Sequence, residues 1–172
     1  PHIIIIASAM KHIDMCEFNV KEALATNTDG VFNVCEAVEI LETHYLNSIE
    51  NVVFISSDKA TSPTNVYGMT KSISERIIVE YSQKMRKTKV KFVNCRYGNI
   101  LNSRGSIIPK LQESKDSVYY LTDERMTRFV MSQEEAIQLI IFSIINGNSG
   151  ETIVPHISCI NISFRIKYLL GK

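Results

Sequence analysis

Short apolar runs of strand length alternate along this chain with longer amphipathic stretches, and this alternation limits the possible fold more than any other feature. The apolar runs cover residues 3–9, 52–55 and 90–95 and are rich in β-branched side chains, which is typical of strands buried on both faces of a parallel sheet. Between them, apolar residues at helical spacing predict one helix over residues 20–46 and another after Pro63. This order predicts an α/β protein in which helices cover a parallel sheet.

Polar and small residues replace this pattern after Tyr97. Residues 98–106 are rich in Gly, Asn and Ser, a composition that indicates a binding loop rather than a tight turn. No internal repeat or linker marks a second domain, so we expect residues 1–172 to form a single domain with one core. The elements predicted beyond the loop are a strand at 118–121, a helix at 133–145, a strand at 152–154 and the beginning of a helix at 162–170.

The composition is that of an ordinary folded domain and gives no electrostatic reason for a polyanionic partner. Of the 172 residues, 45% are hydrophobic and 22% charged, and 19 Lys and Arg against 18 Asp and Glu leave a net charge of +1. No apolar stretch approaches the roughly 20 residues that a membrane helix needs. We therefore predict a soluble, cytoplasmic protein that binds neither nucleic acid nor a membrane.

The cysteines and histidines are not spaced as metal ligands. The chain has no CxxC pair, and its four histidines do not complete a ligand set with the cysteines. The sequence therefore predicts no metal site, and we expect the thiols to be reduced and buried in a cytoplasmic protein. The four cysteines are Cys16, Cys35, Cys95 and Cys159.

The first indication of chemistry is a tyrosine and a lysine four residues apart, Tyr67 and Lys71, at the start of a predicted helix. The preceding strand ends in Ser56, Ser57 and Asp58. Residues i and i+4 share one helix face, so we expect the Lys71 ammonium to lie near the Tyr67 phenol and to lower its pKa from about 10 toward neutrality. Tyr67 would then be a general base. The alternative is a packed Tyr67 beside a solvated Lys71, because such a pair also arises by chance.

Several blocks of sequence occur in the order in which one enzyme family has them. They are Ala7-Ser8-Ala9-Met10-Lys11-His12, Asn27-Thr28-Asp29-Gly30, Ser57-Asp58-Lys59-Ala60 with Pro63, Asn65 and Tyr67-Gly68-Met69-Thr70-Lys71, Arg96-Tyr97-Gly98-Asn99, Ser103-Arg104-Gly105-Ser106, Leu121-Thr122-Asp123 with Met126-Thr127-Arg128-Phe129, and Gly150-Glu151 before Val154-Pro155. With them the chain resembles the extended tyrosine-dependent short-chain dehydrogenase/reductases, and within these the inverting UDP-N-acetylglucosamine 4,6-dehydratases of polysaccharide biosynthesis. The sugar epimerases usually lack the Asp58-Lys59 pair, and Tyr67 resembles the C5-inverting members.

The resemblance covers the middle and C-terminal part of the family. It implies a partial Rossmann-like, doubly wound parallel sheet without its N-terminal strands, with a small substrate-binding C-terminal part. The chain is then one incomplete NAD(P)-binding dehydratase domain in which residues 98–172 mainly bind substrate. NADP is the expected cofactor, with NAD as the alternative. The chain has no Gly-rich turn from a strand into a helix for the pyrophosphate, because its close glycine pair, Gly147 and Gly150, follows a predicted helix.

The resemblance also implies catalytic roles for Asp58, Lys59, Tyr67 and Lys71. Tyr67, helped by Lys71, takes the proton of the sugar 4-hydroxyl while hydride leaves C4 for NADP. Lys59, as a neutral amine, then removes the C5 proton, and a protonated Asp58 donates to the departing 6-hydroxyl before hydride returns to C6. The alternative for Asp58 and Lys59 is a surface ion pair. Their place at the carboxyl end of a sheet strand favours the catalytic interpretation.

The resemblance implies further residues in binding. It also implies a UDP-sugar as the substrate and a homo-oligomer as the state of the full-length protein. Guanidinium groups pair bidentately with phosphate oxygens, so the arginines are candidates for the sugar-nucleotide diphosphate, although exposed loop arginines are commonly only solvated. The expected cofactor contacts are Ala7, Lys11, Ile55, Ser56, Tyr67, Lys71 and Ile100, and the expected substrate contacts are Lys11, Ser57, Asn99, Arg104, Arg125 and Arg128.

Two other functions stay open on the sequence alone. A UDP-sugar C4 epimerase of the same fold uses the same class of substrate. A non-catalytic remnant or interaction module keeps the fold without the chemistry, but it has no chemical reason to retain Asp58, Lys59, Tyr67 and Lys71 together. The sequence therefore favours a dehydratase that forms a 4-keto-6-deoxy sugar.

Overall fold

The computed structural model describes residues 1–44, 48–101, 103 and 123–162. The chain divides into two compact units, Pro1–Tyr97 with Leu139–Pro155 and Gly98–Gln138 with His156–Lys172. The first unit contains the block predicted to be catalytic, from Asp58 to Lys71. The second contains part of the segment predicted to bind substrate.

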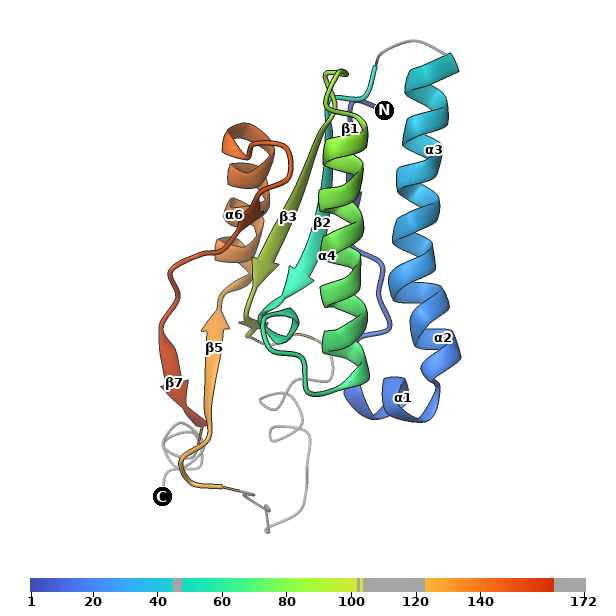
Figure 1. Cartoon of the computed structure of the whole chain (residues 1–172). Coiled ribbons are helices and arrows are strands. Elements are labelled where there is room, and N and C mark those ends of the chain that lie inside the picture. Colours follow the sequence, from blue (N-terminus) through green and yellow to red (C-terminus); the bar gives the residue numbers. More distant parts are fainter. Residues whose placement is uncertain (45–47, 102, 104–122, 163–172) are drawn as a thin grey trace. The chain divides into compact units, whose positions relative to one another are not determined.

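A four-stranded parallel sheet forms the centre of the first unit (Figure 1). β1 pairs with β2 from Ile3 opposite Asn51, and β2 pairs with β3 as far as Ser57 opposite Tyr97. Because the pairs are parallel and follow chain order, each connection crosses back over the sheet through a helix. The predicted α/β fold is therefore confirmed. The strands, in sheet order, are β1 (Ile3–Ile6), β2 (Asn51–Ser57), β3 (Lys91–Tyr97) and β6 (Thr152–Ile153).

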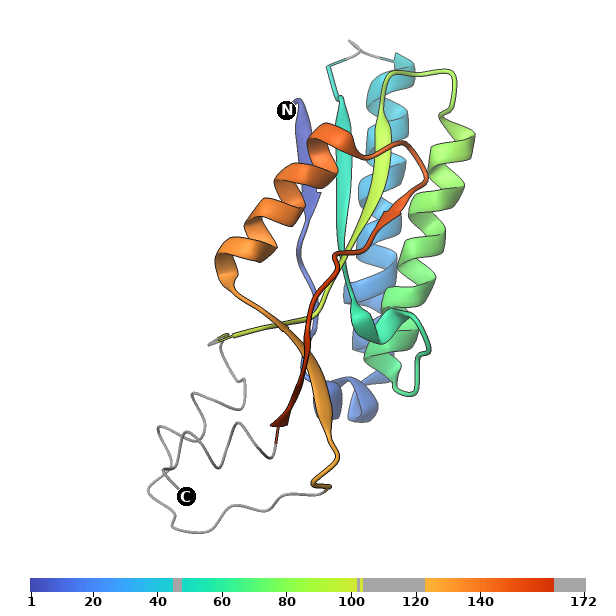
Figure 2. The same cartoon turned by 90° about the vertical axis from the view of Figure 1, so that its left-hand side faces the viewer.

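Helices cover both faces of this sheet (Figure 2). The long helices α3 (Gly30–His44) and α4 (Val66–Lys84) lie side by side on one face, and the part of α6 (Gln133–Asn146) that belongs to this unit lies on the other. Lys91 of β3 donates from Nζ to the Ile144 carbonyl oxygen of α6 at 3.3 Å. The shorter helical segments are α1 (Ile13–Phe18), α2 (Val20–Leu24), a π-helical turn (Ala25–Asp29) and the 3-10 turn η2 (Asp58–Ala60).

The core of the first unit lies between the sheet and helices α3 and α4. Every residue of β2 is buried, as expected of a central strand covered on both faces. At the edge of the sheet, Ile3 and Ile5 of β1 remain 43% and 47% exposed. Side chains from both layers meet in the core, among them Val52, Phe54, Phe92, Val31, Val38, Ile78 and Tyr81.

A small three-stranded sheet forms the described part of the second unit. β4 (Asn99–Ile100) pairs in parallel with β5 (Thr127–Met131), and β5 pairs antiparallel with β7 (Cys159–Asn161). The sequence does not predict these strands, because they are short and the first three residues of β5 are exposed. No buried apolar run therefore marks them.

The structure corrects several expectations at the level of elements. The single helix predicted over residues 20–46 consists of α2, the π-helical turn and α3 as far as His44, and residues 45–46 lie outside the described residues. Cys159 is exposed, so the expectation of burial is wrong for this thiol, whereas the other three cysteines are buried. The strand predicted at 118–121 lies outside the described residues, as does the helix predicted at 162–170 after its first residue. None of the helices in the described segments has the length and hydropathy of a membrane span.

Candidate active site

The carboxyl ends of β1, β2 and β3 lie at one edge of the parallel sheet, which is where open α/β sheets bind ligands. Residues 7–12 follow β1, η2 follows β2, and Tyr97 ends β3. The first turn of α4 approaches the same edge so closely that a Cβ on Gly68 would lie 2.5 Å from the Lys59 carbonyl oxygen of η2. The topology therefore brings together the loop after β1, the block 57–59 and the start of α4.

Two side chains fix the first turn of α4. Asn65 is the N-cap residue, and its Oδ1 accepts a hydrogen bond from the Gly68 N–H at 2.8 Å. Glu17, from α1, accepts a hydrogen bond from the Val66 N–H at 2.7 Å, at the helix end where negative charge is favourable. The beginning of α4 is thus held by a local cap and by a second helix.

Lys71 is a buried cation, with 3% of its surface exposed. Its Nζ donates to the Ile55 carbonyl oxygen at 2.8 Å and lies 4.5 Å from the centroid of the Phe54 ring. Burial lowers the pKa of Lys71 to about 8, and the Glu75 carboxylate opposes this shift. The alternative of a solvated Lys71 is therefore wrong.

Tyr67 is a neutral phenol in this structure. Burial raises its pKa to about 12, while a side-chain hydrogen bond with Ser57 lowers it in part. The lowering that the sequence predicts from Lys71 does not occur, because the ammonium donates to the Ile55 carbonyl oxygen instead. The four-residue spacing places both residues on one helix face but does not fix the directions of their side chains.

Ser57, Asp58 and Lys59 form a connected polar group at the end of β2. Ser57 Oγ donates to Asp58 Oδ1 at 2.8 Å, and Lys59 Nζ lies 3.0 Å from the same oxygen. The Lys59 N–H donates to Ser57 Oγ at 3.3 Å and so begins the η2 turn. The Lys59 and Asp58 side chains are 27% and 23% exposed, so this ion pair is shielded far more than a solvated surface pair.

Asn27 joins the loop after β1 to α4, a role that the sequence analysis missed. The side chain is fully buried in the π-helical turn between α2 and α3, and such turns are frequent at functional sites. Its Oδ1 accepts from the Met10 N–H at 2.7 Å, and its Nδ2 donates to the Met10 carbonyl oxygen and to Thr70 Oγ1, each at 3.1 Å. One amide thereby holds residues 7–12 beside the turn that contains Lys71.

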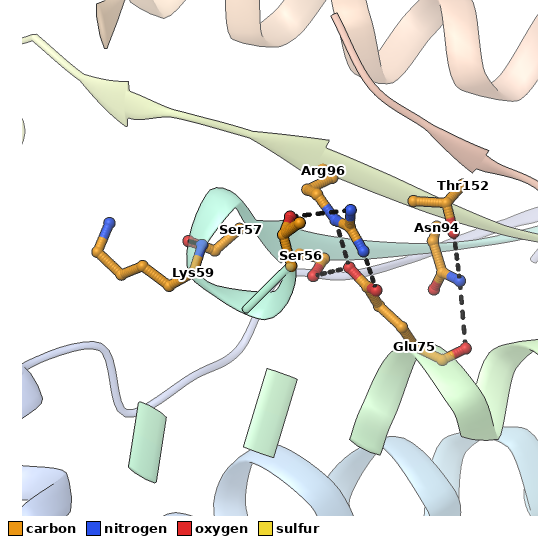
Figure 3. Close-up of polar contacts among 8 residues, drawn as sticks. Ser56, Ser57, Lys59, Glu75, Asn94, Arg96 and Thr152 are labelled. Carbon is orange, nitrogen blue, oxygen red and sulfur yellow. Dashed lines mark hydrogen bonds and ion pairs between the residues drawn. The ribbon is translucent and has the colours of Figure 1, made fainter. Parts of the chain in front are cut away.

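A partly buried ion pair that the sequence does not predict lies one helical turn beyond Lys71. Both carboxylate oxygens of Glu75 accept hydrogen bonds from Arg96, and Oε1 also accepts one from Ser56 Oγ (Figure 3). Arg96 NH1 donates to Thr61 Oγ1 at 3.1 Å. The sequence shows that Glu75 follows Lys71 by one helical turn. It does not show the pairing with Arg96, because Arg96 lies on β3 and Glu75 on α4.

The remaining predicted residues of the first unit differ in what they offer a ligand. Ala7 and Lys11 are exposed in the loop after β1. Ile55 and Ser56 are buried at the end of β2, where the Ile55 carbonyl oxygen is bound by Lys71 and the Ser56 hydroxyl by Glu75. The Ser56 hydroxyl therefore donates its proton to a buried carboxylate of the protein.

The second unit contains the other predicted binding residues. Asn99 and Ile100 form β4, and Asn99 Nδ2 donates to the Phe129 carbonyl oxygen at 2.8 Å. Arg125 is paired with Asp123 at 2.8 Å, although 90% of its side chain is exposed. Arg128 NH1 donates to the Thr127 carbonyl oxygen at 2.8 Å. Arg104 lies outside the described residues.

The side chains at the sheet edge can move protons at several points. The site combines a neutral phenol, a carboxyl group in contact with an amine, and a buried ammonium. Such a set can act as acid and base at neighbouring atoms of one substrate. Within the described ranges, no cluster of three His, Cys, Asp or Glu side chains is arranged to hold a metal ion.

Curated relatives of this chain include two kinds of nucleotide-sugar enzyme. It is 33% identical over 163 residues to the inverting UDP-N-acetylglucosamine 4,6-dehydratase of Campylobacter jejuni, covering 93% of this chain and 47% of that protein. It is 32% identical over 169 residues to the UDP-glucose 4-epimerase of Rickettsia bellii, covering 96% of this chain and 47% of that protein. The chain thus spans about half the length of these curated relatives.

Solved structures have the same fold. Pen from Bacillus thuringiensis matches with a TM-score of 0.88 and 33% identity, over 98% of this chain and 51% of that one. DesIV, a dTDP-glucose 4,6-dehydratase from Streptomyces venezuelae solved with NAD bound, matches with a TM-score of 0.77 and 16% identity, over 98% and 57%, which shows the fold alone. The family described as polysaccharide biosynthesis protein matches residues 1–170. This chain therefore belongs to the polysaccharide biosynthesis protein family, and it is similar to nucleotide-sugar dehydratases and epimerases.

Proposed function

We propose that the protein containing this chain is a UDP-N-acetylglucosamine 4,6-dehydratase that makes a 4-keto-6-deoxy sugar for polysaccharide or glycan synthesis. The observation that carries this proposal is the Asp58–Lys59 pair, an acid and an amine 3.0 Å apart in the group that also contains Ser57, the hydrogen-bond partner of Tyr67. Loss of water across C5 and C6 needs a base for the C5 proton and an acid for the 6-hydroxyl, besides the group that acts on the 4-hydroxyl. The site has one side chain for each task.

The proposed reaction needs Lys59 as a neutral amine and Asp58 as a carboxylic acid, and the two side chains lie in contact at 3.0 Å. Transfer of one proton from Lys59 Nζ to Asp58 Oδ1, over the 3.0 Å contact, leaves a neutral amine and a carboxylic acid. The amine can then take the C5 proton, and the acid can protonate the departing 6-hydroxyl.

Tyr67 and Lys71 act on the 4-hydroxyl in this proposal. Tyr67 takes its proton, and the hydrogen bond between the Tyr67 and Ser57 side chains lowers the pKa of the phenol in part. A bound nicotinamide supplies a positively charged hydride acceptor. Lys71, buried against β2 with a pKa lowered to about 8, places a positive charge one helical turn from Tyr67.

The residues present fit the nicotinamide end of such a cofactor. The small side chain of Ala7 is exposed directly after β1, at the carboxyl edge of the sheet, and Lys71 is bound to the Ile55 carbonyl oxygen near the carboxyl end of β2. The sequence has no matching site for the pyrophosphate end, because it contains no Gly-rich motif between a strand and a helix. We propose NADP as the cofactor, with NAD as the alternative.

A UDP-sugar C4 epimerase is the second candidate, and the 32% identity to the Rickettsia bellii epimerase favours it. Epimerisation removes and returns hydride at C4 and needs a base at the 4-hydroxyl only. It gives no task to the Asp58–Lys59 pair, so this pair favours the dehydratase.

Product analysis separates the two candidates. The protein containing this chain is incubated in D₂O with UDP-N-acetylglucosamine and NADP or NAD, and the products are followed by NMR and mass spectrometry. A dehydratase gives a product that has lost one water and carries a 4-keto group, with deuterium in place of hydrogen at C5. A product of unchanged mass, inverted at C4 and without deuterium at C5, identifies an epimerase. If neither product forms with either cofactor, the proposed function is wrong.

A further inference from the structure

The proposed reaction gives no task to the Glu75–Arg96 ion pair. The Glu75 and Arg96 side chains are only 8% and 20% exposed. Removing two charges from water carries a desolvation cost that their attraction often fails to repay, and apolar side chains of similar size commonly serve as well. A shielded pair of this kind is therefore a weak argument for stability, and its place in the fold indicates another role.

The pair joins α4 to two neighbouring strands at one level of the sheet. Ser56 of β2 and Arg96 of β3 are register partners. Both donate hydrogen bonds to the Glu75 carboxylate of α4 (Figure 3), with Arg96 Nε 2.9 Å from Oε1. The Glu75 backbone carbonyl also accepts from Asn94 Nδ2 at 3.2 Å. One turn of α4 is thus bound to the ends of β2 and β3 through side chain and backbone.

The Glu75 contacts lie next to the Lys71 hydrogen bond on the helix and on the strand alike. Lys71 precedes Glu75 by one helical turn, and its acceptor, the Ile55 carbonyl oxygen, precedes Ser56 in β2. The helix turn that carries the donor and the strand that carries the acceptor are therefore tied together by the bond from Ser56 to Glu75. Guanidinium binding to both carboxylate oxygens gives this link a defined orientation.

The negative charge of Glu75 also favours the charged form of Lys71. On the β2 side the Lys71 Nζ meets an uncharged carbonyl oxygen and the Phe54 ring. On α4, the Glu75 carboxylate is the charged group whose field acts on it, and it opposes the loss of charge that burial favours. Arg96 acts on Lys71 through its hydrogen bonds to Glu75.

We infer that Glu75 and Arg96 are positioning residues whose ion pair holds the Lys71 ammonium, charged and correctly placed, against the carboxyl end of β2. This inference rests on the proposed function in treating Lys71 as part of the catalytic site. Neither Glu75 nor Arg96 touches a reacting atom in it. Their effect is transmitted through the position and charge of Lys71.

The direct test is a pH titration of Lys71 in the folded protein. The lysine side chains are labelled with ¹³C, the Lys71 signal is assigned by its loss in Lys71→Met, and its midpoint is measured in wild type and in Glu75→Gln. We expect a lower midpoint in Glu75→Gln, because the carboxylate that favours the charged amine is gone. The matched control is Glu39→Gln, which removes a carboxylate that pairs with Lys84 at 2.6 Å and should leave the Lys71 midpoint unchanged.

A second variant covers the case in which Glu75→Gln does not fold because the partly buried Arg96 loses its carboxylate partner. The double variant Glu75→Gln/Arg96→Met removes both charges together, and the same downward movement of the Lys71 midpoint is expected. In folded variants we also expect kcat/KM to fall about 10²-fold, as misplacement of a catalytic group commonly causes. A folded variant with the wild-type midpoint overturns the inference, whatever its activity. Absence of dehydratase activity in wild type refutes the proposed function instead. The titration then still tests whether Glu75 controls the charge of Lys71.

Discussion

At the scale of single residues, burial moves the two helix side chains of the site toward their neutral forms. The pKa of Lys71 is lowered to about 8 and that of Tyr67 is raised to about 12. The sequence predicts the pair correctly as neighbours on one helix face, but its i,i+4 spacing cannot show that the ammonium donates to the Ile55 carbonyl oxygen. The electrostatic state of the site is therefore a property of the packing against β2.

The shifted pKa of Lys71 predicts a pH-dependent stability. An unfolded lysine titrates near 10.5 and the folded Lys71 near 8, so between these values the unfolded chain binds more protons and the free energy of unfolding rises with pH. From pH 7 to pH 10 we expect Lys71 to contribute an increase of about 2–3 kcal/mol. Urea unfolding of wild type and Lys71→Met over this range measures the difference. Parallel pH curves for the two proteins would show that Lys71 is not buried as described.

A second prediction at the residue scale concerns Lys59. Lys59→Met removes the proposed C5 base while Tyr67 and Lys71 remain, so oxidation at C4 continues and loss of water slows by at least about 10²-fold. The measurements are deuterium uptake at C5 and the absorbance of reduced nicotinamide, which should accumulate. Lys84→Met is the matched control, since Lys84 is a half-exposed lysine paired with Glu39, and its rates should equal those of wild type. Undiminished water loss in Lys59→Met would exclude Lys59 as the base.

At the scale of elements, the site depends on how closely the first turn of α4 approaches η2. A Cβ on Gly68 would lie 2.5 Å from the Lys59 carbonyl oxygen and 3.3 Å from Pro63 Cβ. Neither the carbonyl nor the proline ring can turn aside as a flexible side chain would. The absence of a side chain at this position therefore sets the distance between the turn that carries Tyr67 and the one that carries Lys59.

Gly68→Ala should consequently separate these two elements. We expect the free energy of unfolding to fall by about 1–3 kcal/mol from overpacking and kcat to fall about 10²-fold from misplacement of the catalytic groups. Gly30→Ala is the control: its Cβ would meet nothing closer than the Ala25 carbonyl oxygen at 3.7 Å. Because Gly30 has helical dihedral angles, alanine there should stabilise by about 0.5–1 kcal/mol. Thermal unfolding and steady-state kinetics of both variants check this, and equal effects would contradict the argument.

At the scale of the whole molecule, the sequence predicts what depends on buried periodicity and misses what depends on contacts between distant segments. The apolar runs identify β1, β2 and β3, and the block 57–59 is placed correctly at the end of β2. The strands β4, β5 and β7 are not predicted, since Thr127, Arg128 and Phe129 are exposed. The Asn27 and Glu75 networks are missed for a different reason: their partners are 17 to 43 residues away for Asn27 and 19 to 21 for Glu75, beyond any local pattern.

The binding residues that the chain does carry predict how it responds to cofactor fragments. In the proposed site Ala7 and Lys71 bind the nicotinamide end, whereas the sequence has no Gly-rich motif for the pyrophosphate. Thermal unfolding of the 172-residue chain should therefore shift equally, and only slightly, with NADP and with nicotinamide mononucleotide. A ligand present at 100 times its Kd stabilises by about 2.7 kcal/mol, so a longer polypeptide that supplies the Gly-rich turn should respond much more to NADP than to the mononucleotide. A much larger shift with NADP for the 172-residue chain alone would mean that these residues hold the whole dinucleotide, contrary to this prediction.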